Sequence, residues 1–208
     1  PVDWPSAEAA CKALAGISLP VRIDLPQSAL THDGWTDSLL FTHDGISGPA
    51  VLKASLFWEE GEILRLDFTP EIDVEALLDA PENARTQALT VVRRLMPQRL
   101  AQALTPRDLC RRNCAELSRT HRRRIAAAIQ RRTVIPAALA GFPRAEAAAG
   151  GVGLAHINPK TMESALVPRL WFMGEALDVT GLLGGYNLHW AWASALAAAR
   201  HMARVLTA

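Results

Sequence analysis

Hydrophobic residues in the first part of the chain come in short runs that are broken by turn residues. The runs lie at 17–25, 38–41 and 62–68, and the last one alternates apolar positions with charged residues such as Arg65 and Asp67. Short runs with a period of two are typical of β-strands. We therefore expect a β-rich segment over residues 1–84.

A glycine loop follows the second of these runs. Leu40 and Phe41 end the run, and Pro49 opens another apolar stretch. Proline suits the first position of a helix, and Ser47 or Gly48 can cap it. The pattern predicts a strand, a tight loop and the start of a helix.

The spacing of apolar residues changes to three and four over 84–104 and 108–131, which predicts two helices. The segment 105–108 combines a capping residue, a proline and an early acid, so it favours the entry to the second helix. A strand is expected near 133–140, at a sheet edge because it holds Pro136.

Glycines and one long apolar stretch mark the last part of the chain. The run at 170–173 predicts a buried strand that ends at Gly174, and an alanine-rich stretch predicts a helix over about 188–206. Residues 179–199 carry no charge, but the glycines and polar side chains among them are incompatible with a lipid-facing helix. We expect no membrane contact.

Composition indicates a globular protein with an uneven charge distribution. Of 208 residues, 50% are hydrophobic and 21% are charged, with a net charge of +1. Residues 1–84 carry 4 Lys or Arg and 15 Asp or Glu, residues 85–144 carry 14 and 2, and residues 145–208 carry 4 and 4. Such a partition marks a charged arm or two patches that face each other.

The cysteines and the first residues bear on the compartment. Cys11, Cys110 and Cys114 lack the spacing of a zinc site or a disulfide scaffold, and the histidines show no ligand spacing either, so we predict no metal. Free cysteines fit a reducing compartment. The start of the chain does not resemble a signal peptide, and we expect a cytoplasmic protein.

The predicted strand, loop and helix near the C-terminus form an arrangement that can bind an anionic or electron-rich group. The first turn of a helix has unpaired N–H groups and a partial positive charge. Glu175 and Asp178 can accept hydrogen bonds from ligand hydroxyls, and glycines let the backbone approach closely. The alternative is an ordinary glycine turn before a helix.

Six runs together carry a resemblance to a known family. They lie at 14–20, 40–49, 150–152, 157–164, 174–179 and 184–191. In this order they resemble the HI0933-like family of FAD-containing flavoproteins, some of which are named aminoacetone oxidases. The resemblance extends over nearly the whole chain.

The resemblance implies an α+β protein in which a Rossmann-like FAD-binding domain is interrupted by an insertion. Residues 1–84 would form a barrel-like β-rich subdomain, residues 85–144 an arginine-rich helical subdomain, and residues 145–208 the returning C-terminal part of the FAD domain. The glycine fingerprint that seats the FAD pyrophosphate is absent from this chain. FAD binding would therefore require an N-terminal half as partner, and the chain alone would be inactive.

The resemblance also implies roles for residues in the C-terminal part. Gly174, Glu175 and Asp178 would lie along the ribityl and phosphate side of FAD. The flavin ring would be approached by Gly184, Gly185, Tyr186, Asn187 and Leu188. A second cofactor loop would be formed by Gly150, Gly151 and Val152.

The loop at Thr42 and His43 is the candidate for chemistry on the substrate side. An imidazole there can exchange a proton near neutral pH. The alternative is that both side chains only satisfy backbone groups of the loop.

Two functions are expected. The resemblance implies flavin redox chemistry on a small metabolite of the amine or carbonyl type. The basic segment indicates binding of RNA or another polyanion through its arginines, either as the substrate of a flavin-dependent modification or as a partner. Those arginines are Arg111, Arg112, Arg122, Arg123 and Arg124. They could instead face the acidic residues of 59–82.

Overall fold

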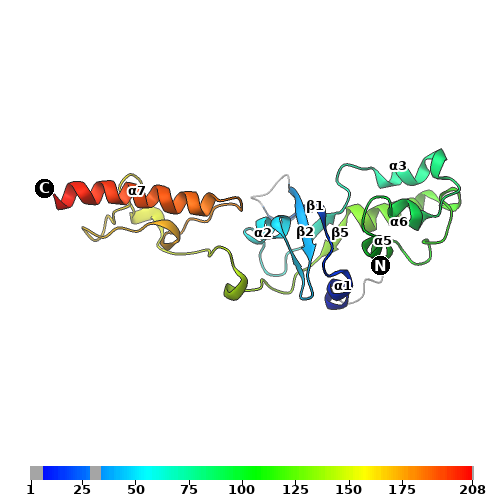
Figure 1. The fold of residues 1–208 in the computed structure, drawn as a ribbon, viewed down its shortest axis with the longest axis horizontal. Helices are drawn as coiled ribbons and strands as arrows, with labels where there is room; N and C mark the ends of the chain where they lie inside the picture. Colours follow the sequence, from blue (N-terminus) through cyan, green and yellow to red (C-terminus); the bar gives the residue numbers. More distant parts are fainter. Residues whose placement is uncertain (1–6, 29–33, 208) are drawn as a thin grey trace. The chain divides into compact units, whose positions relative to one another are not determined.

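The computed structural model describes residues 7–28 and 34–207, with the side chains of residues 7–9 excepted. The first residues, to which the expectation about a signal peptide applied, lie outside this described part. The chain divides into two compact units, Pro1–Ala138 and Leu139–Ala208. Each is considered by itself (Figure 1).

The first unit contains an antiparallel sheet. Its strands are β1 (Ser18–Asp24), β2 (Trp35–Phe41), β3 (Ile46–Ser47), β4 (Leu64–Asp67) and β5 (Arg132–Val134), in the order β3-β2-β1-β4-β5. The sheet confirms the strands predicted at 17–25, 38–41 and 62–68. β5 lies at the edge, as Pro136 indicated, and ends earlier than predicted.

The central strand β1 shows how sequence pattern and pairing agree. Leu19, Val21 and Ile23 point into the core, while Ser18 and Pro20 are exposed. β1 pairs with β2 along residues 18–23 but with β4 only from Arg22 on. Pro20, which has no N–H to donate, therefore lies where β1 has one neighbour.

Helices pack against the sheet and against one another in the same unit. They are α1 (Ala7–Leu14), α2 (Pro49–Ser55), α3 (Val74–Asp79), α4 (Ala88–Val92), α5 (Gln98–Leu104) and α6 (Arg119–Gln130), with short 3₁₀ turns η1 (Pro81–Asn83) and η2 (Cys114–Glu116). One core joins strands and helices through side chains such as Val21, Leu39, Leu66, Leu100 and Ile129. The protein is α+β with a barrel-like sheet and a helical part, as the family resemblance implied.

The helix predicted from Pro49 is confirmed in position and cap. Gly48 is its N-cap with φ 92°, and Pro49 occupies the first turn. A Cβ at Gly48 would lie 2.7 Å from the carbonyl oxygen of Ser38. Glycine is therefore required both by the backbone conformation and by the close approach to β2.

The two long helices predicted over 84–104 and 108–131 are wrong as continuous helices. Pro97 separates α4 from α5. The segment 105–108 begins a turn rather than a helix, because the backbone that follows it bonds to the segment 84–89. The Ala88 amide donates to the Arg112 carbonyl, and the Cys114 amide donates to the Thr86 carbonyl, each at 2.9 Å. The second helix, α6, begins only at Arg119, after the N-cap Ser118, whose side chain accepts from the His121 amide in a capping box.

The second unit consists of turns packed on one long helix, α7 (Tyr186–Leu206). The turns include η3 (Phe142–Arg144), η4 (Leu154–His156) and η5 (Gly174–Ala176). The strand predicted at 170–173 is wrong, since only Trp171 forms an isolated bridge there, to Glu163. α7 begins two residues before the predicted start. No helix among the described residues is long and apolar enough to cross a membrane.

Candidate functional site

Two of the predicted cofactor loops lie side by side in the second unit. The Val152 amide donates to the Ala176 carbonyl at 2.9 Å, and the Asp178 amide donates to the Val152 carbonyl at 3.0 Å. Gly151 has φ 129°, and a Cβ there would lie 2.8 Å from the Ala176 oxygen. The structure therefore brings Gly150, Gly151 and Val152 next to the loop that carries Glu175 and Asp178.

Both polar backbone groups of Gly174 form hydrogen bonds with side chains of α7. Its amide donates to Ser194 Oγ at 2.9 Å, and its carbonyl accepts from Trp190 Nε1 at 3.1 Å. Gly174 is buried with φ 60°, and Ser194 is 1% exposed. The two α7 side chains fix the point at which η5 begins.

The sequence did not assign a positioning role to Ser194 or Trp190. The available signal was a serine and an indole N–H in an alanine-rich helix, since buried polar groups need partners. That signal does not say which backbone groups are the partners.

The N-terminus of α7 is open. Gly185 is the N-cap with φ 92°, and no side chain caps the helix. Among the described residues no acceptor is recorded for the amides of residues 186–188, which are the orphan donors of a first helical turn. These donors and the helix dipole favour an electron-rich group at this end.

Asn187 is committed to the preceding loop. Its Oδ1 accepts from the Gly181 amide at 2.7 Å, and its Nδ2 donates to the Gly181 carbonyl at 3.2 Å. A Cβ at Gly181 would lie 2.7 Å from Tyr186 Cβ. The side-chain amide of Asn187 thus positions the loop at Gly181 next to the first turn of α7.

The polar and apolar groups around this helix end are accessible. Glu175, Asp178, Gly184, Gly185, Tyr186 and Leu188 are all exposed. Neither carboxylate forms an ion pair with another described residue. They are therefore available to hydroxyl donors of a ligand.

The loop at His43 lies in the first unit, between β2 and β3. Thr42 Oγ1 donates to the Gly45 carbonyl at 3.0 Å and accepts from the Gly45 amide at 3.1 Å. The Thr42 side chain therefore closes the turn, while His43 is exposed at its tip. The structure assigns Thr42 a local stabilising contact.

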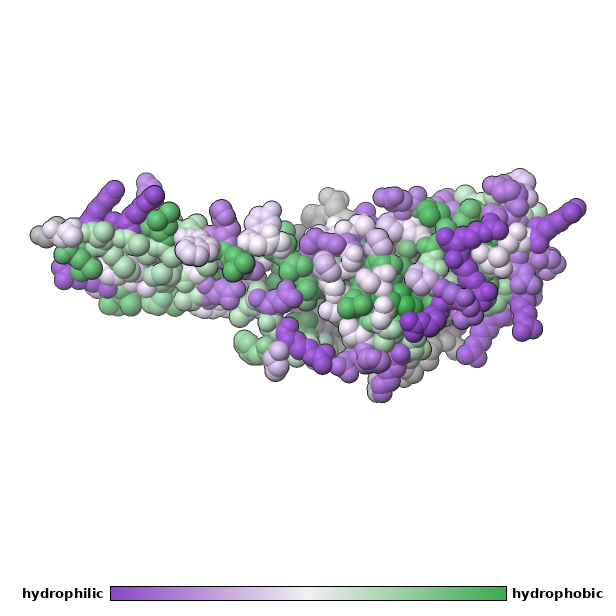
Figure 2. Space-filling model, viewed as in Figure 1, coloured by the Kyte–Doolittle hydropathy of each residue, from purple (hydrophilic) through white to green (hydrophobic). Residues whose placement is uncertain are grey.

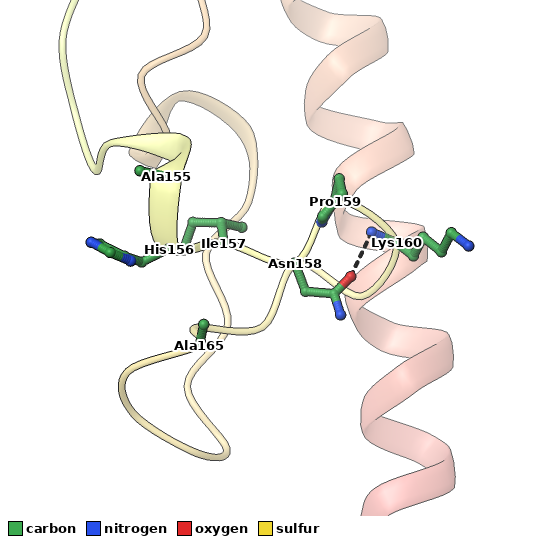
Figure 3. Close-up of a pocket in the computed structure, with 7 residues that line it drawn as sticks. All are labelled: Ala155, His156, Ile157, Asn158, Pro159, Lys160 and Ala165. Atoms are coloured by element: carbon green, nitrogen blue, oxygen red, sulfur yellow. Dashed lines mark hydrogen bonds between the residues drawn. The ribbon is translucent and has the colours of Figure 1, made fainter.

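A shallow depression in the second unit does not gather reactive side chains. Its lining includes His156, Asn158 and Lys160. Asn158 Oδ1 accepts from the Lys160 amide at 2.9 Å, which closes the turn between them. Figure 3 shows the His156 and Lys160 side chains pointing to opposite sides, so they do not converge on a bound group.

The arginines of α6 face acidic neighbours. Arg122 pairs with Asp79 at 3.0 Å, and Arg123 pairs with Glu75 at 3.4 Å. Both acids belong to the acidic segment of 59–82. Arg124 pairs with Asp108 at 2.7 Å, whereas Arg111 and Arg112 are exposed. The predicted polyanion-binding set is thus divided between paired and unpaired side chains.

The cysteines show no sign of reactive thiolates. Burial raises the pKa of the Cys11, Cys110 and Cys114 thiols. All three are free, and no group of His, Cys, Asp or Glu in the described part of the chain could hold a metal ion.

Comparison with known proteins identifies relatives of this fold. The family model described as "HI0933-like protein barrel and H2TH domain" matches residues 1–147. The chain is 38% identical over 207 residues to a "Ribosomal RNA dihydrouridine synthase" of Haemophilus influenzae, covering 98% of this chain and 51% of that protein. It is 35% identical over 198 residues to the Escherichia coli protein of the same name, covering 92% and 48%.

A third relative has a different substrate in its name. The chain is 31% identical over 204 residues to a "3-dehydro-bile acid delta(4,6)-reductase" of Clostridium scindens, covering 89% of this chain and 49% of that protein. All three names are those of oxidoreductase-type enzymes. The chain spans about half the length of these curated relatives.

Proposed function

The chain belongs to the HI0933-like family, and we propose that it is the C-terminal portion of a flavin-dependent reductase that acts on RNA. The observation that carries the proposal is the uncapped N-terminus of α7. Two glycine loops, 150–152 and 174–178, are hydrogen-bonded to each other, and the second is held on this helix through Gly174. The exposed carboxylates of Glu175 and Asp178 belong to the second loop. The relatives named ribosomal RNA dihydrouridine synthase support RNA as substrate.

The residues around the start of α7 suit FAD. Glu175 and Asp178 would accept hydrogen bonds from ribityl or ribose hydroxyls, and Gly184 and Gly185 leave room for the ring. The first-turn amides of α7 would stabilise negative charge on the reduced isoalloxazine if the ring were bound at this helix end, because unpaired N–H groups place positive dipoles there. When bound, FAD supplies the hydride for the reduction.

The reduction of a uracil ring requires a hydride on one carbon of the C5=C6 bond and a proton on the other. A nicotinamide coenzyme is the class of donor that would supply the two electrons to FAD. We assign the proton transfer to His43, which is exposed at the tip of its turn, and the shape of that turn to Thr42.

A small substrate is the second candidate. The sequence suggested a metabolite of the amine or carbonyl type, and the relative named bile acid reductase acts on a small molecule. RNA is favoured for this chain because residues 85–144 hold 14 Lys or Arg against 2 Asp or Glu.

An N-terminal half is the proposed partner of this chain. Trp192, Leu196 and Leu206 lie on one face of α7 at helical spacing, and they are 80%, 52% and 68% exposed. Figure 2 shows apolar side chains along the surface that α7 forms. Since the relatives are about twice as long, we propose that their remaining half covers this face and supplies the FAD pyrophosphate site. The chain alone would be inactive, and its free cysteines favour a reducing, cytoplasmic setting.

Co-purification tests this proposal. The chain should be colourless when produced alone, and joined to the N-terminal half it should be yellow, with flavin absorbance in the visible range. The joined protein with a nicotinamide coenzyme should convert uridine to dihydrouridine in unmodified ribosomal RNA. A colourless joined protein would contradict the cofactor assignment, and a yellow protein that leaves the RNA unchanged would contradict the substrate assignment.

A further inference from the structure

The arginines of the helical part fall into two groups that the sequence did not separate. Three arginines of α6 are used within the fold, since Arg122, Arg123 and Arg124 each pair with an acid. Other arginines are exposed, and their guanidinium groups form no ion pair with a described residue. They include Arg93, Arg107, Arg111 and Arg112.

These four arginines lie around the turn at 106–112. Arg107, Arg111 and Arg112 belong to it. The Leu89 amide donates to the Cys110 carbonyl at 3.3 Å and the Arg93 amide donates to the Leu89 carbonyl at 2.9 Å, so Arg93 follows one helical turn after a residue that is bonded to this turn. The hydrogen bond from Arg124 is the main reason why the pKa of Asp108 is lowered, and the charge of Arg112 adds to it.

The turn that carries these arginines is held firmly. The amides of Leu109 and Cys110 donate to the Pro106 carbonyl at 2.9 and 3.1 Å. The Ala88 amide donates to the Arg112 carbonyl at 2.9 Å, which ties the turn to α4, and the Leu109 side chain is fully buried. The guanidinium groups therefore extend from a backbone that needs little further ordering.

The charge of this surface is not cancelled locally. The acid within the turn is Asp108, and Arg124 of α6 already occupies it at 2.7 Å. The surrounding positive charges are thus free for an external anion.

The chemistry of the turn favours nucleic acid over other polyanionic surfaces. Its apolar residues Pro106 and Leu109 are buried, so it offers no side chain for insertion into lipid. It also lacks the aromatic centre of a protein interface. Guanidinium groups match phosphate oxygens in bidentate geometry.

We propose that Arg93, Arg107, Arg111 and Arg112 bind the phosphate backbone of the RNA substrate, whereas Arg122, Arg123 and Arg124 serve the fold. This assignment rests on the proposed function, and it names the surface that holds the substrate. Contacts of this kind position the RNA without reading its sequence.

The test uses the full-length, flavin-loaded protein with a transcribed, unmodified ribosomal RNA fragment. The variant R107Q/R111Q/R112Q removes three charges from the turn. The control R65Q/R131Q/R204Q removes three exposed arginines on β4, after α6 and in the last turn of α7. Flavin content and circular dichroism verify that both variants fold.

Binding is measured as a function of salt concentration. Each lost phosphate contact lowers the slope of log K against log salt by about 0.7 to 0.9. The turn variant should therefore lose about 2 to 3 units of slope and bind on the order of 100-fold more weakly at 0.1 M salt. The KM of the turn variant for RNA should rise while its kcat is retained. The control variant should keep most of the slope of log K against log salt.

Two results overturn the assignment while leaving the proposed function intact. One is a turn variant that reduces uridine and keeps the wild-type slope. The other is an equal loss of slope in the control, which would show that only net charge matters. Absence of uridine reduction by the wild-type protein is a separate failure, and it removes the proposed function itself.

Discussion

Removal of the Ser194 hydroxyl tests the clamp that fixes the cofactor loop. In Ser194→Ala the buried Gly174 amide loses its acceptor, which lies at 2.9 Å in the wild type. A buried donor without a partner costs about 1–3 kcal/mol. The Trp190 carbonyl, to which Ser194 Oγ donates at 2.7 Å, belongs to the helix and keeps its backbone partner. The cost therefore falls mainly on the loop.

Hydrogen exchange of the segment 174–178 measures this cost directly, because local opening sets the exchange rate. A change of about 1–3 kcal/mol corresponds to exchange that is about 5- to 150-fold faster. Trp190→Phe, which removes the donor to the Gly174 carbonyl, should accelerate the same segment. Thr120→Ala deletes an exposed hydroxyl on α6 and should change nothing there. Unchanged exchange in Ser194→Ala would refute the clamp.

Three further predictions concern the first unit. Burial raises the pKa of Asp67, so its contribution to stability is greatest below the unfolded carboxyl pKa and is lost as pH rises through the folded value. Asp67→Asn retains an acceptor for the Thr69 amide and should raise the urea midpoint of unfolding at pH 7 but not at pH 3. A lower midpoint at pH 7 would show that burial of the charged carboxylate is not costly. Ile129→Ala, at a fully buried site of α6, should cost about 2–5 kcal/mol in urea unfolding, and Ile72→Ala, at a site 39% exposed, much less; equal losses would contradict the position of the core. His43→Ala in the full-length, flavin-loaded protein should slow uridine reduction without changing flavin content, and unchanged turnover would remove His43 from the chemistry.

The strands were predictable because their signals are local. In β1 the alternation of buried Leu19, Val21 and Ile23 with exposed neighbours can be read directly from the sequence. The start of α2 was equally clear, because proline and glycine restrict the backbone at Pro49 and Gly48. Both features depend on a few adjacent residues.

The helical segments were less predictable because long-range hydrogen bonds decide them. Apolar spacing of three and four continues through 108–118, yet the backbone of this region pairs with residues 84–89. Pro97 separates α4 from α5, but the apolar spacing of three and four continues past it, so the spacing alone predicted one helix. Pairing between distant segments leaves no periodic trace in either one.

The candidate site shows the same division. Glycine positions such as Gly174 and Gly185 were recognised from their runs, and both have positive φ. The Ser194 and Trp190 contacts could not be foreseen, because they join residues 16 and 20 positions from Gly174. Likewise, sequence alone could not separate the ion-paired arginines of α6 from the unpaired ones around Arg111, because the acids Asp79 and Glu75 lie on another helix.

The most direct test of the account is mass spectrometry of unmodified ribosomal RNA after incubation with the full-length, flavin-loaded protein and a nicotinamide coenzyme. We expect that a uridine gains two hydrogens and that the gain depends on flavin. RNA whose mass is unchanged, with a protein that is yellow and fully folded, would contradict it.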